Sequence, residues 1–115
     1  MERELVAHGR VAHLVTRGRT SGAARSVAVG FVDEPGGSVL VAANDPHTDW
    51  ALNLLADPAV EVEIGQRRFA AVAHELDETD HGRAVRGLIL RYGTPSERLG
   101  SGPSFRLVPV DPSGS

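Results

Sequence analysis

Short segments in which apolar and polar residues alternate recur along this chain, and they limit its fold more than any other feature of the sequence. In residues 60–64, every second position is Val or Ile and glutamates fill the positions between them. That period of two is typical of a strand with one buried face. Because a Pro-Gly-Gly turn separates residues 25–33 from 38–44, these two segments are expected to form a hairpin. In all, strands are predicted at residues 11–16, 25–33, 38–44, 59–65, 69–76 and 105–110.

Two helices are predicted between the strands. The first is expected to begin at Asp45-Pro46, since Asp caps helices well and Pro fits the first helical position. It should end at Asp57, because Pro58 disfavours helical geometry in the residue before it. The second is expected to begin near residues 77–80 and to end at Gly93. Its apolar stripe at helical spacing is formed by Val85, Leu88, Ile89 and Tyr92.

About six mainly antiparallel strands and two helices predict an α+β domain, built as a small barrel that is closed or half closed. With 115 residues the chain has the length of one domain, expected at residues 1–112, with a frayed Ser/Gly tail at 113–115. No segment approaches the ~20 apolar residues of a transmembrane helix, and the N-terminus lacks the apolar stretch of a signal peptide. A cytoplasmic location is therefore expected.

Charge and composition exclude several chemistries. The net charge of −3 gives no basic field for a nucleic-acid backbone, so no nucleic-acid partner is expected. The absence of cysteine excludes disulfides, a cysteine nucleophile and Cys-ligated metal sites. All twelve basic residues are arginine, which excludes a P-loop lysine and Schiff-base chemistry. The five histidines show no metal-ligand spacing, so no metal site is expected.

The densest cationic feature is a Gly-rich loop between the first two predicted strands, at residues 17–25. Its three guanidiniums and two hydroxyls come from Arg17, Arg19, Arg25, Thr20 and Ser21. Glycines let backbone N–H groups approach an anion, and arginine offers planar donors to phosphate or carboxylate. The loop is therefore interpreted either as an anion-binding site or as a solvated turn whose arginines pair with surface carboxylates.

A second candidate region is the junction where the strand ending at Asn44 leads into the first helix. Backbone donors at a helix N-terminus favour anionic or electron-rich ligand groups. Trp50, the only tryptophan, either contacts a ligand there or fills the core at the helix start. Tyr92, the only tyrosine, is either a packed residue with its hydroxyl at the rim or a proton donor facing a ligand cleft. No catalytic acid–base pair can be assigned from spacing.

Taken in order, four segments of the chain resemble the deazaflavin (F420)-dependent nitroreductase and quinone reductase family, a group of small actinobacterial proteins. Residues 16–25 read TRGRTSGAAR, against the family's Thr-x-Gly-Arg-(Lys or Arg)-Ser-Gly-x-x-Arg. Residues 50–60 read WALNLLADPAV, against Trp-x-x-Asn-Leu-x-Ala-x-Pro-x-Val. Residues 39–43 and 105–110 complete the pattern, and the similarity spans about residues 12–112.

The resemblance implies a split β-barrel related to flavin mononucleotide-binding (FMN-binding) oxidases, with coenzyme F420 as the cofactor. It implies hydride transfer from the reduced deazaflavin to an electron-poor small molecule such as a quinone or nitro compound. Tyr92 falls where relatives place an aromatic residue of the acceptor cleft, and Thr20 departs from the family's basic residue, which removes one cationic contact. The cofactor-binding residues that it implies are Arg17, Arg19, Thr20, Ser21, Arg25, Ala43, Asn44 and Trp50.

Other interpretations stay open on the sequence. The chain is alternatively a non-catalytic protein that binds F420 or another small ligand, or a split barrel that binds FMN through the same arginines. Its length is compatible with a homodimer and with a monomer.

Overall fold

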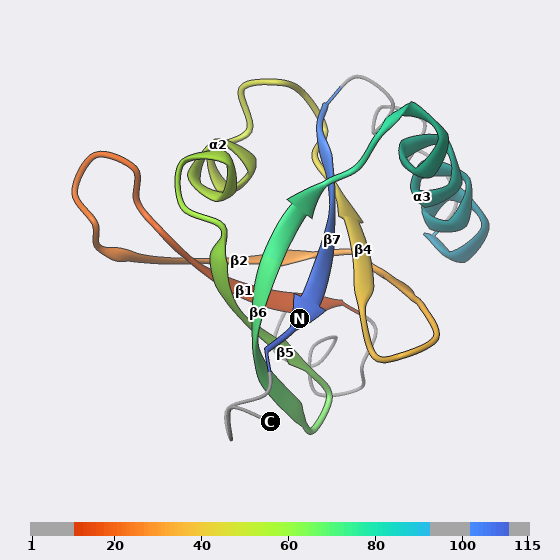
Figure 1. Cartoon of the computed structure of the whole chain (residues 1–115), viewed down its shortest axis with the longest axis horizontal. Coiled ribbons are helices and arrows are strands. Elements are labelled where there is room, and N and C mark those ends of the chain that lie inside the picture. Colours follow the sequence, from red (N-terminus) through yellow and green to blue (C-terminus); the bar gives the residue numbers. More distant parts are fainter. Residues whose placement is uncertain (1–10, 93–101, 111–115) are drawn as a thin grey trace.

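The computed structural model describes residues 11–92 and 102–110, which form one sheet and two helices (Figure 1). The helices are α2 (Asp49–Ala56) and α3 (Glu78–Tyr92). All strand pairs are antiparallel, in the order β2-β1-β5-β6-β7-β4-β3. The expected tail at residues 113–115 lies outside the described residues. The strands are β1 (Ala12–Arg17), β2 (Ala24–Val29), β3 (Val32–Asp33), β4 (Val39–Ala42), β5 (Ala59–Ile64), β6 (Arg67–Glu75) and β7 (Ser104–Pro109).

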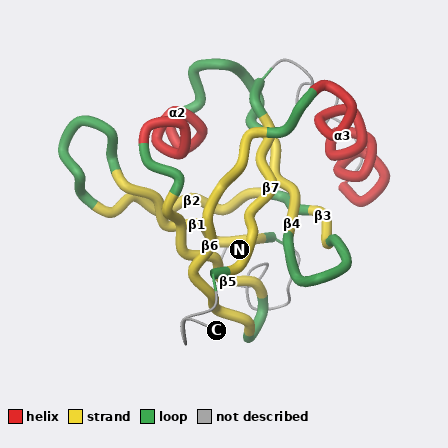
Figure 2. The backbone as a smooth tube through the Cα atoms, in the orientation of Figure 1, coloured by secondary structure: helices red, strands yellow, loops and turns green. Residues whose placement is uncertain are grey.

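A two-residue bend joins the two ends of the sheet. β2 and β3 lie at opposite ends of the strand order, yet β2 ends at Val29 and β3 begins at Val32. Segments so close along the chain can occupy opposite ends of the order only if the sheet curls until its ends approach each other. The strands follow this curled path in Figure 2. Phe31, within the bend, belongs to the core and is 1% exposed.

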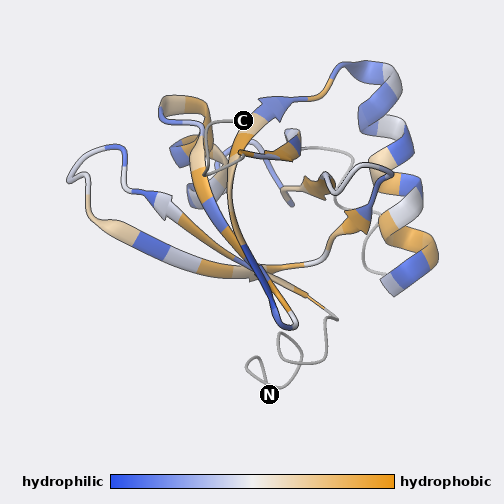
Figure 3. Cartoon of the chain, turned by 60° about the horizontal axis from the view of Figure 1, so that its bottom comes forward, coloured by the Kyte–Doolittle hydropathy of each residue, from blue (hydrophilic) through white to orange (hydrophobic). Residues whose placement is uncertain are grey.

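Inward-facing strand residues fill the barrel. In β5, Val60, Val62 and Ile64 are buried, as the alternation of the sequence predicts. Hydrophilic and hydrophobic residues follow one another along the strands (Figure 3). Trp50 of α2 packs against Phe105 of β7 with 6.0 Å between ring centroids, so this helix adds its own aromatic residue to the core.

The predicted hairpin of residues 25–33 and 38–44 is wrong in most of its length. β2 pairs with β1, and only the two residues of β3 pair with β4, in the register Val32↔Leu40 and Asp33↔Val39. The alternation of Val27, Val29 and Phe31 does not reveal the interruption, because these residues keep facing the barrel on both sides of the bend.

The predicted start of the first helix is also wrong. α2 begins at Asp49, with Thr48 in the N-cap position, while its end next to Asp57 is confirmed. The Asp45 carboxylate accepts a hydrogen bond from the His47 N–H at 2.7 Å, and the Thr48 hydroxyl donates to the Asp45 carbonyl at 3.0 Å. These bonds form a separate turn, which is the alternative that Asp offers to a helix N-terminus.

Helix α3 is attached to the sheet through a close contact and a two-point hydrogen bond. Its buried residues are Ala84 and Leu88; of the predicted apolar stripe, Leu88 is buried and Val85, Ile89 and Tyr92 are half-buried. Gly87 lets the helix approach β3, since a Cβ there would lie 2.9 Å from Val32 Cγ2. The Tyr92 hydroxyl accepts from the Phe31 N–H at 3.1 Å and donates to the Phe31 carbonyl at 3.3 Å.

A charged cluster holds the beginning of α3. Arg106 of β7 donates to both carboxylate oxygens of Glu34, at 2.7 and 3.1 Å, and to Asp80 of α3 at 3.4 Å. The hydrogen bond that Arg106 donates to Glu34 raises the pKa of Arg106 above its ordinary value, so this guanidinium stays charged. Within the described residues, neither helix is long and apolar enough to span a bilayer.

The two glycines inside α3 should respond oppositely to alanine. Gly82→Ala meets no heavy atom within 4 Å, so we expect stabilisation by about 1 kcal/mol from helix propensity. Gly87→Ala places a Cβ 2.9 Å from Val32, and overpacking of a core contact costs about 1–3 kcal/mol. Urea titrations of the two variants measure the difference in free energy of unfolding. Equal stabilisation by both would contradict the close packing of α3 on β3.

Candidate functional site

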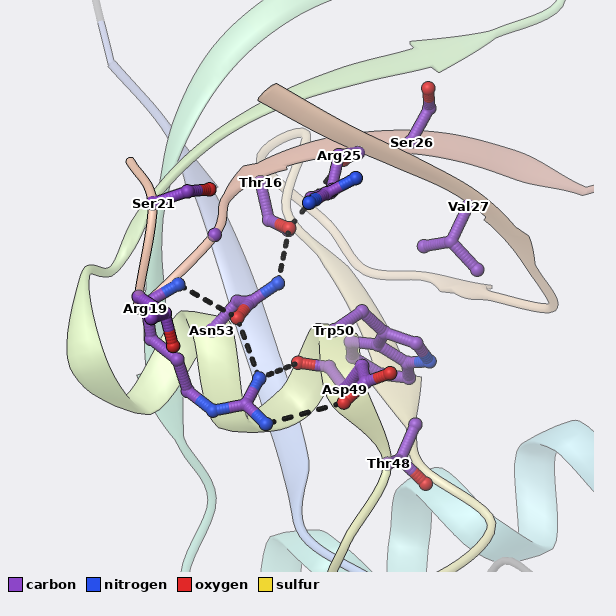
Figure 4. Close-up of a pocket in the computed structure, with 12 residues that line it drawn as sticks. Thr16, Arg19, Ser21, Arg25, Ser26, Val27, Thr48, Asp49, Trp50 and Asn53 are labelled. Atoms are coloured by element: carbon purple, nitrogen blue, oxygen red, sulfur yellow. Dashed lines mark hydrogen bonds and ion pairs between the residues drawn. The ribbon is translucent and has the colours of Figure 1, made fainter. Parts of the chain in front are cut away.

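A cleft lies between the β1–β2 loop, the first half of β2 and the beginning of α2 (Figure 4). Its volume is about 560 Å³, within the ~300–1,000 Å³ range of small-molecule sites. We name it the arginine cleft. It is lined by Thr16, Gly18, Arg19, Thr20, Ser21, Arg25, Ser26, Val27, Thr48, Asp49, Trp50 and Asn53.

The β1–β2 loop has a closed hydrogen-bonded geometry and stands out from the sheet beside α2 (Figure 1). The Gly18 N–H donates to the Ala23 carbonyl at 2.8 Å, and the Gly22 N–H donates to the Gly18 carbonyl at 2.7 Å. Gly22 has a φ of 73°, a value that residues with a Cβ rarely adopt. The Ser21 hydroxyl accepts from the Ala23 N–H at 3.2 Å. The loop is therefore a defined turn, and its side chains project from fixed positions.

Asn53 fastens this loop to α2. Its side chain is buried, with 4% of the residue exposed. The amide oxygen accepts from the Arg19 backbone N–H at 3.1 Å and from Arg19 Nη1 at 2.9 Å. The amide nitrogen donates to the Thr16 hydroxyl of β1 at 3.3 Å. One side chain thus fixes the spacing of strand, loop and helix on the floor of the cleft.

The charges of the cleft are two guanidiniums and one carboxylate. Arg19 pairs with Asp49, with 3.2 Å between Nη2 and Oδ1. Within the described residues the Arg25 guanidinium forms no hydrogen bond or ion pair, and its residue is exposed. The balance is therefore cationic, which suits an anionic ligand group.

A second cleft, which we name the apolar cleft, adjoins the first. Its volume is about 380 Å³, and it shares Trp50 and Val27 with the arginine cleft. It contains no charged residue among those that line it, so its walls suit an uncharged or flat aromatic group. Its lining is Val11, Val27, Ala28, Val29, Gly30, Ala42, Asn44, Trp50, Leu88 and Tyr92.

The structure brings together most of the predicted site residues. Five of them line the arginine cleft, Asn44 and Tyr92 line the apolar cleft, and Trp50 lines both. Arg17 and Ala43 line neither: Arg17 Nη1 donates to the Gly22 carbonyl at 3.4 Å, and Ala43 is buried with its N–H bound to the Pro103 carbonyl at 2.9 Å. The predicted residues in the arginine cleft are Arg19, Thr20, Ser21, Arg25 and Trp50.

Sequence reasoning missed the polar residues that position the arginines. Asn53 and Asp49 were not among the predicted site residues, although both line the cleft. Thr16 was not predicted either, and it is 1% exposed. A polar residue at an inward position of a strand or an apolar helix requires a hydrogen-bond partner, so Thr16 and Asn53 carried a usable signal. Asp49 carried none, because an acidic residue in a first helical turn is ordinary.

Tyr92 has a structural contact as well as a place in the apolar cleft. Its hydroxyl is held by both backbone groups of Phe31, and its ring lies so close to Gly30 that a Cβ there would be 2.9 Å from Tyr92 Cε2. Trp50 fits both interpretations made from the sequence, a core residue and a ligand contact. It is 9% exposed and packs on Phe105, and it also lines both clefts.

Among the residues described, no three His, Asp or Glu are grouped to hold a metal ion.

Solved structures of several proteins share this split-barrel fold. An F420-H2 dependent reductase, FDR-A, is 25% identical with a TM-score of 0.73, over 85% of this chain and 93% of that protein. HutZ, the heme storage protein from Vibrio cholerae, is 20% identical with a TM-score of 0.73, over 95% and 87%. A putative pyridoxamine 5'-phosphate oxidase from Listeria innocua is 15% identical with a TM-score of 0.69, over 96% and 94%.

Sequence comparison identifies a family for most of the chain. The family model described as F420H(2)-dependent quinone reductase matches residues 3–95. A comparison with curated proteins finds no match.

Removal of the Asn53 amide should destabilise the protein. In Asn53→Ala the Arg19 N–H loses its partner, and an unsatisfied group of this kind costs about 1–3 kcal/mol, while the Thr16 hydroxyl keeps only its 3.5 Å bond to the Arg25 carbonyl. Leu55→Ala, on the half-exposed face of the same helix, should cost well under that. Urea denaturation compares the two variants. A loss no larger for Asn53→Ala than for Leu55→Ala would contradict the role of Asn53.

Proposed function

Since this chain belongs to the F420H(2)-dependent quinone reductase family, we propose that it is an F420-dependent reductase whose acceptor is a small electron-poor compound such as a quinone or nitro compound. The observation that carries the proposal is that the two clefts adjoin: a cationic one and an uncharged one share Trp50 and Val27 as lining residues. An anionic arm and a flat ring of one cofactor need just such adjoining environments.

The residues of the arginine cleft fit the cofactor. F420 joins a flat deazaflavin ring to a phosphate and an acidic arm. Arg25 and Arg19 are the guanidiniums that would hold the phosphate and the arm. Trp50 and Val27 would form the wall beside the ring, at the junction of the clefts. Arg17 and Ala43 fall outside the cleft and are left out of this assignment.

When bound, reduced F420 supplies the hydride, so the chain has to bind, orient and shield the reactants. The cationic residues would hold one end of the cofactor, and Trp50 and Val27, which line both clefts, would lie beside its ring. The uncharged lining of the apolar cleft would receive the acceptor and exclude water from the place where the two meet.

Cofactor binding can be followed through Trp50, since the only tryptophan lines both clefts. We expect oxidised F420 to quench its fluorescence at micromolar concentrations. Arg25→Ala and Arg19→Ala should each weaken F420 binding about tenfold or more, because each removes a charge-assisted contact of about 1.5–3 kcal/mol. Both should also flatten the salt dependence of the dissociation constant.

Arg68→Ala is the matched control, because Arg68 pairs with Glu63 away from both clefts. Its F420 affinity should equal that of the wild type. Absence of F420 binding at tens of micromolar would refute the proposed function. Tight binding of FMN without F420 would establish the FMN-binding alternative, and F420 binding without turnover across quinones and nitro compounds would favour a binding protein.

Substitutions at Tyr92 separate its hydroxyl from its ring. Tyr92→Phe should keep turnover within about twofold, because the hydroxyl already donates to the Phe31 carbonyl, and should lower stability by about 1 kcal/mol. Tyr92→Ala should raise KM for the acceptor without changing F420 affinity, because it removes a wall of the apolar cleft. Steady-state kinetics with a water-soluble quinone measure both. Loss of most of kcat in Tyr92→Phe would instead identify a proton donor.

A further inference from the structure

The arginine cleft contains its own counter-ion. Asp49 Oδ1 lies 3.2 Å from Arg19 Nη2, and the Asp49 carbonyl accepts from Arg19 Nη1 at 3.5 Å. The Asp49 side chain is 88% exposed and the Arg19 side chain 39%, so the pair stands at the open surface of the cleft (Figure 4). A ligand anion that approaches Arg19 therefore meets a carboxylate already in place.

Asn53 and Asp49 act on the same guanidinium in different ways. Asn53 is buried and binds Arg19 through both the backbone N–H and Nη1, at 3.1 and 2.9 Å. It fixes the position of Arg19 and carries no charge. Asp49 adds one exposed ion pair, and such pairs contribute little to stability. The position of Arg19 thus depends mainly on Asn53, whereas its charge is offset by Asp49.

We infer that Asp49 is a specificity-determining residue that lowers the affinity of the arginine cleft for multiply charged ligand arms. This inference rests on the proposed function, in which the cleft holds the phosphate and acidic arm of F420. The charged residues that line the cleft are Arg19, Arg25 and Asp49. Because Asp49 pairs with Arg19, the Arg19 guanidinium attracts a ligand anion less strongly than it would alone, whereas Arg25 has no such counter-ion among the residues that line the cleft.

The test replaces Asp49 by Asn, which keeps the shape of the side chain and removes its charge. In water, a unit charge about 6 Å from a second one of the same sign changes binding affinity roughly threefold. We expect Asp49→Asn to bind F420 about threefold more tightly at low salt and to show a steeper salt dependence, with the difference shrinking near 0.5 M salt. The same deazaflavin without phosphate and acidic arm should bind both proteins equally.

Glu78→Gln is the matched control. Glu78 is an acidic residue in the first turn of α3, as Asp49 is in the first turn of α2, and it lines neither cleft. The variant therefore repeats the loss of one negative charge and of a helix-dipole contact without touching the site. Its affinity for F420 should equal that of the wild type.

The outcomes separate this inference from the proposed function. F420 binding by wild type with unchanged or weaker binding by Asp49→Asn overturns the role of Asp49 and leaves the proposed function intact. Equal tightening for F420 and for the phosphate-free deazaflavin also overturns it, since the effect would then come from cleft shape. Binding of neither ligand by the wild type refutes the proposed function, and this inference with it.

Discussion

The bend at Gly30 and Phe31 ties the first strand pair to the last, and the shape of the molecule follows from this connection. Because β2 and β3 are two residues apart, the sheet has to curl, and the curled sheet encloses a core large enough for Phe31 and Phe105. β2 pairs with β1 on one side only, so its first half becomes a wall of the arginine cleft. The clefts are thus a product of how the barrel closes.

The closing bend also connects the sheet to the second helix. Tyr92 binds both backbone groups of Phe31 and lines the apolar cleft, so the same contact that holds α3 shapes a ligand surface. In the arginine cleft, Asn53 of α2 likewise joins this helix to the β1–β2 loop and to β1 and lines the cleft itself. Each cleft is therefore supported by one polar side chain that bridges elements far apart in sequence. Rigid support of this kind is what precise placement of a cofactor requires.

Local patterns predicted the elements well and their connections less well. The alternation of Val60, Val62 and Ile64 determines strand and face together, because burial of one face permits a single register. The start of α2 could not be read, since Asp45 caps a turn with the same hydrogen bonds that it would offer a helix. The hairpin prediction failed because strand pairing is a property of the whole barrel.

In the candidate site, too, the local motif could be predicted from the sequence, whereas the contacts between distant residues could not. The arginine loop is visible as a motif, and four of its five polar side chains reach the cleft. Arg17 is the arginine of the loop that does not line the cleft, because the fold of the loop lets its guanidinium donate to the Gly22 carbonyl instead. The pairing of Arg19 with Asp49 joins residues thirty positions apart, and no spacing rule reveals it.

The projecting β1–β2 loop is attached to the rest of the molecule mainly through residues at its base, and its tip at Thr20 and Gly22 is exposed. Changes in the length or composition of an exposed tip disturb a barrel little. Substitutions at this tip can therefore alter the contacts that the arginine cleft offers to a charged ligand and leave the apolar cleft, which Leu88 and Tyr92 line, unchanged.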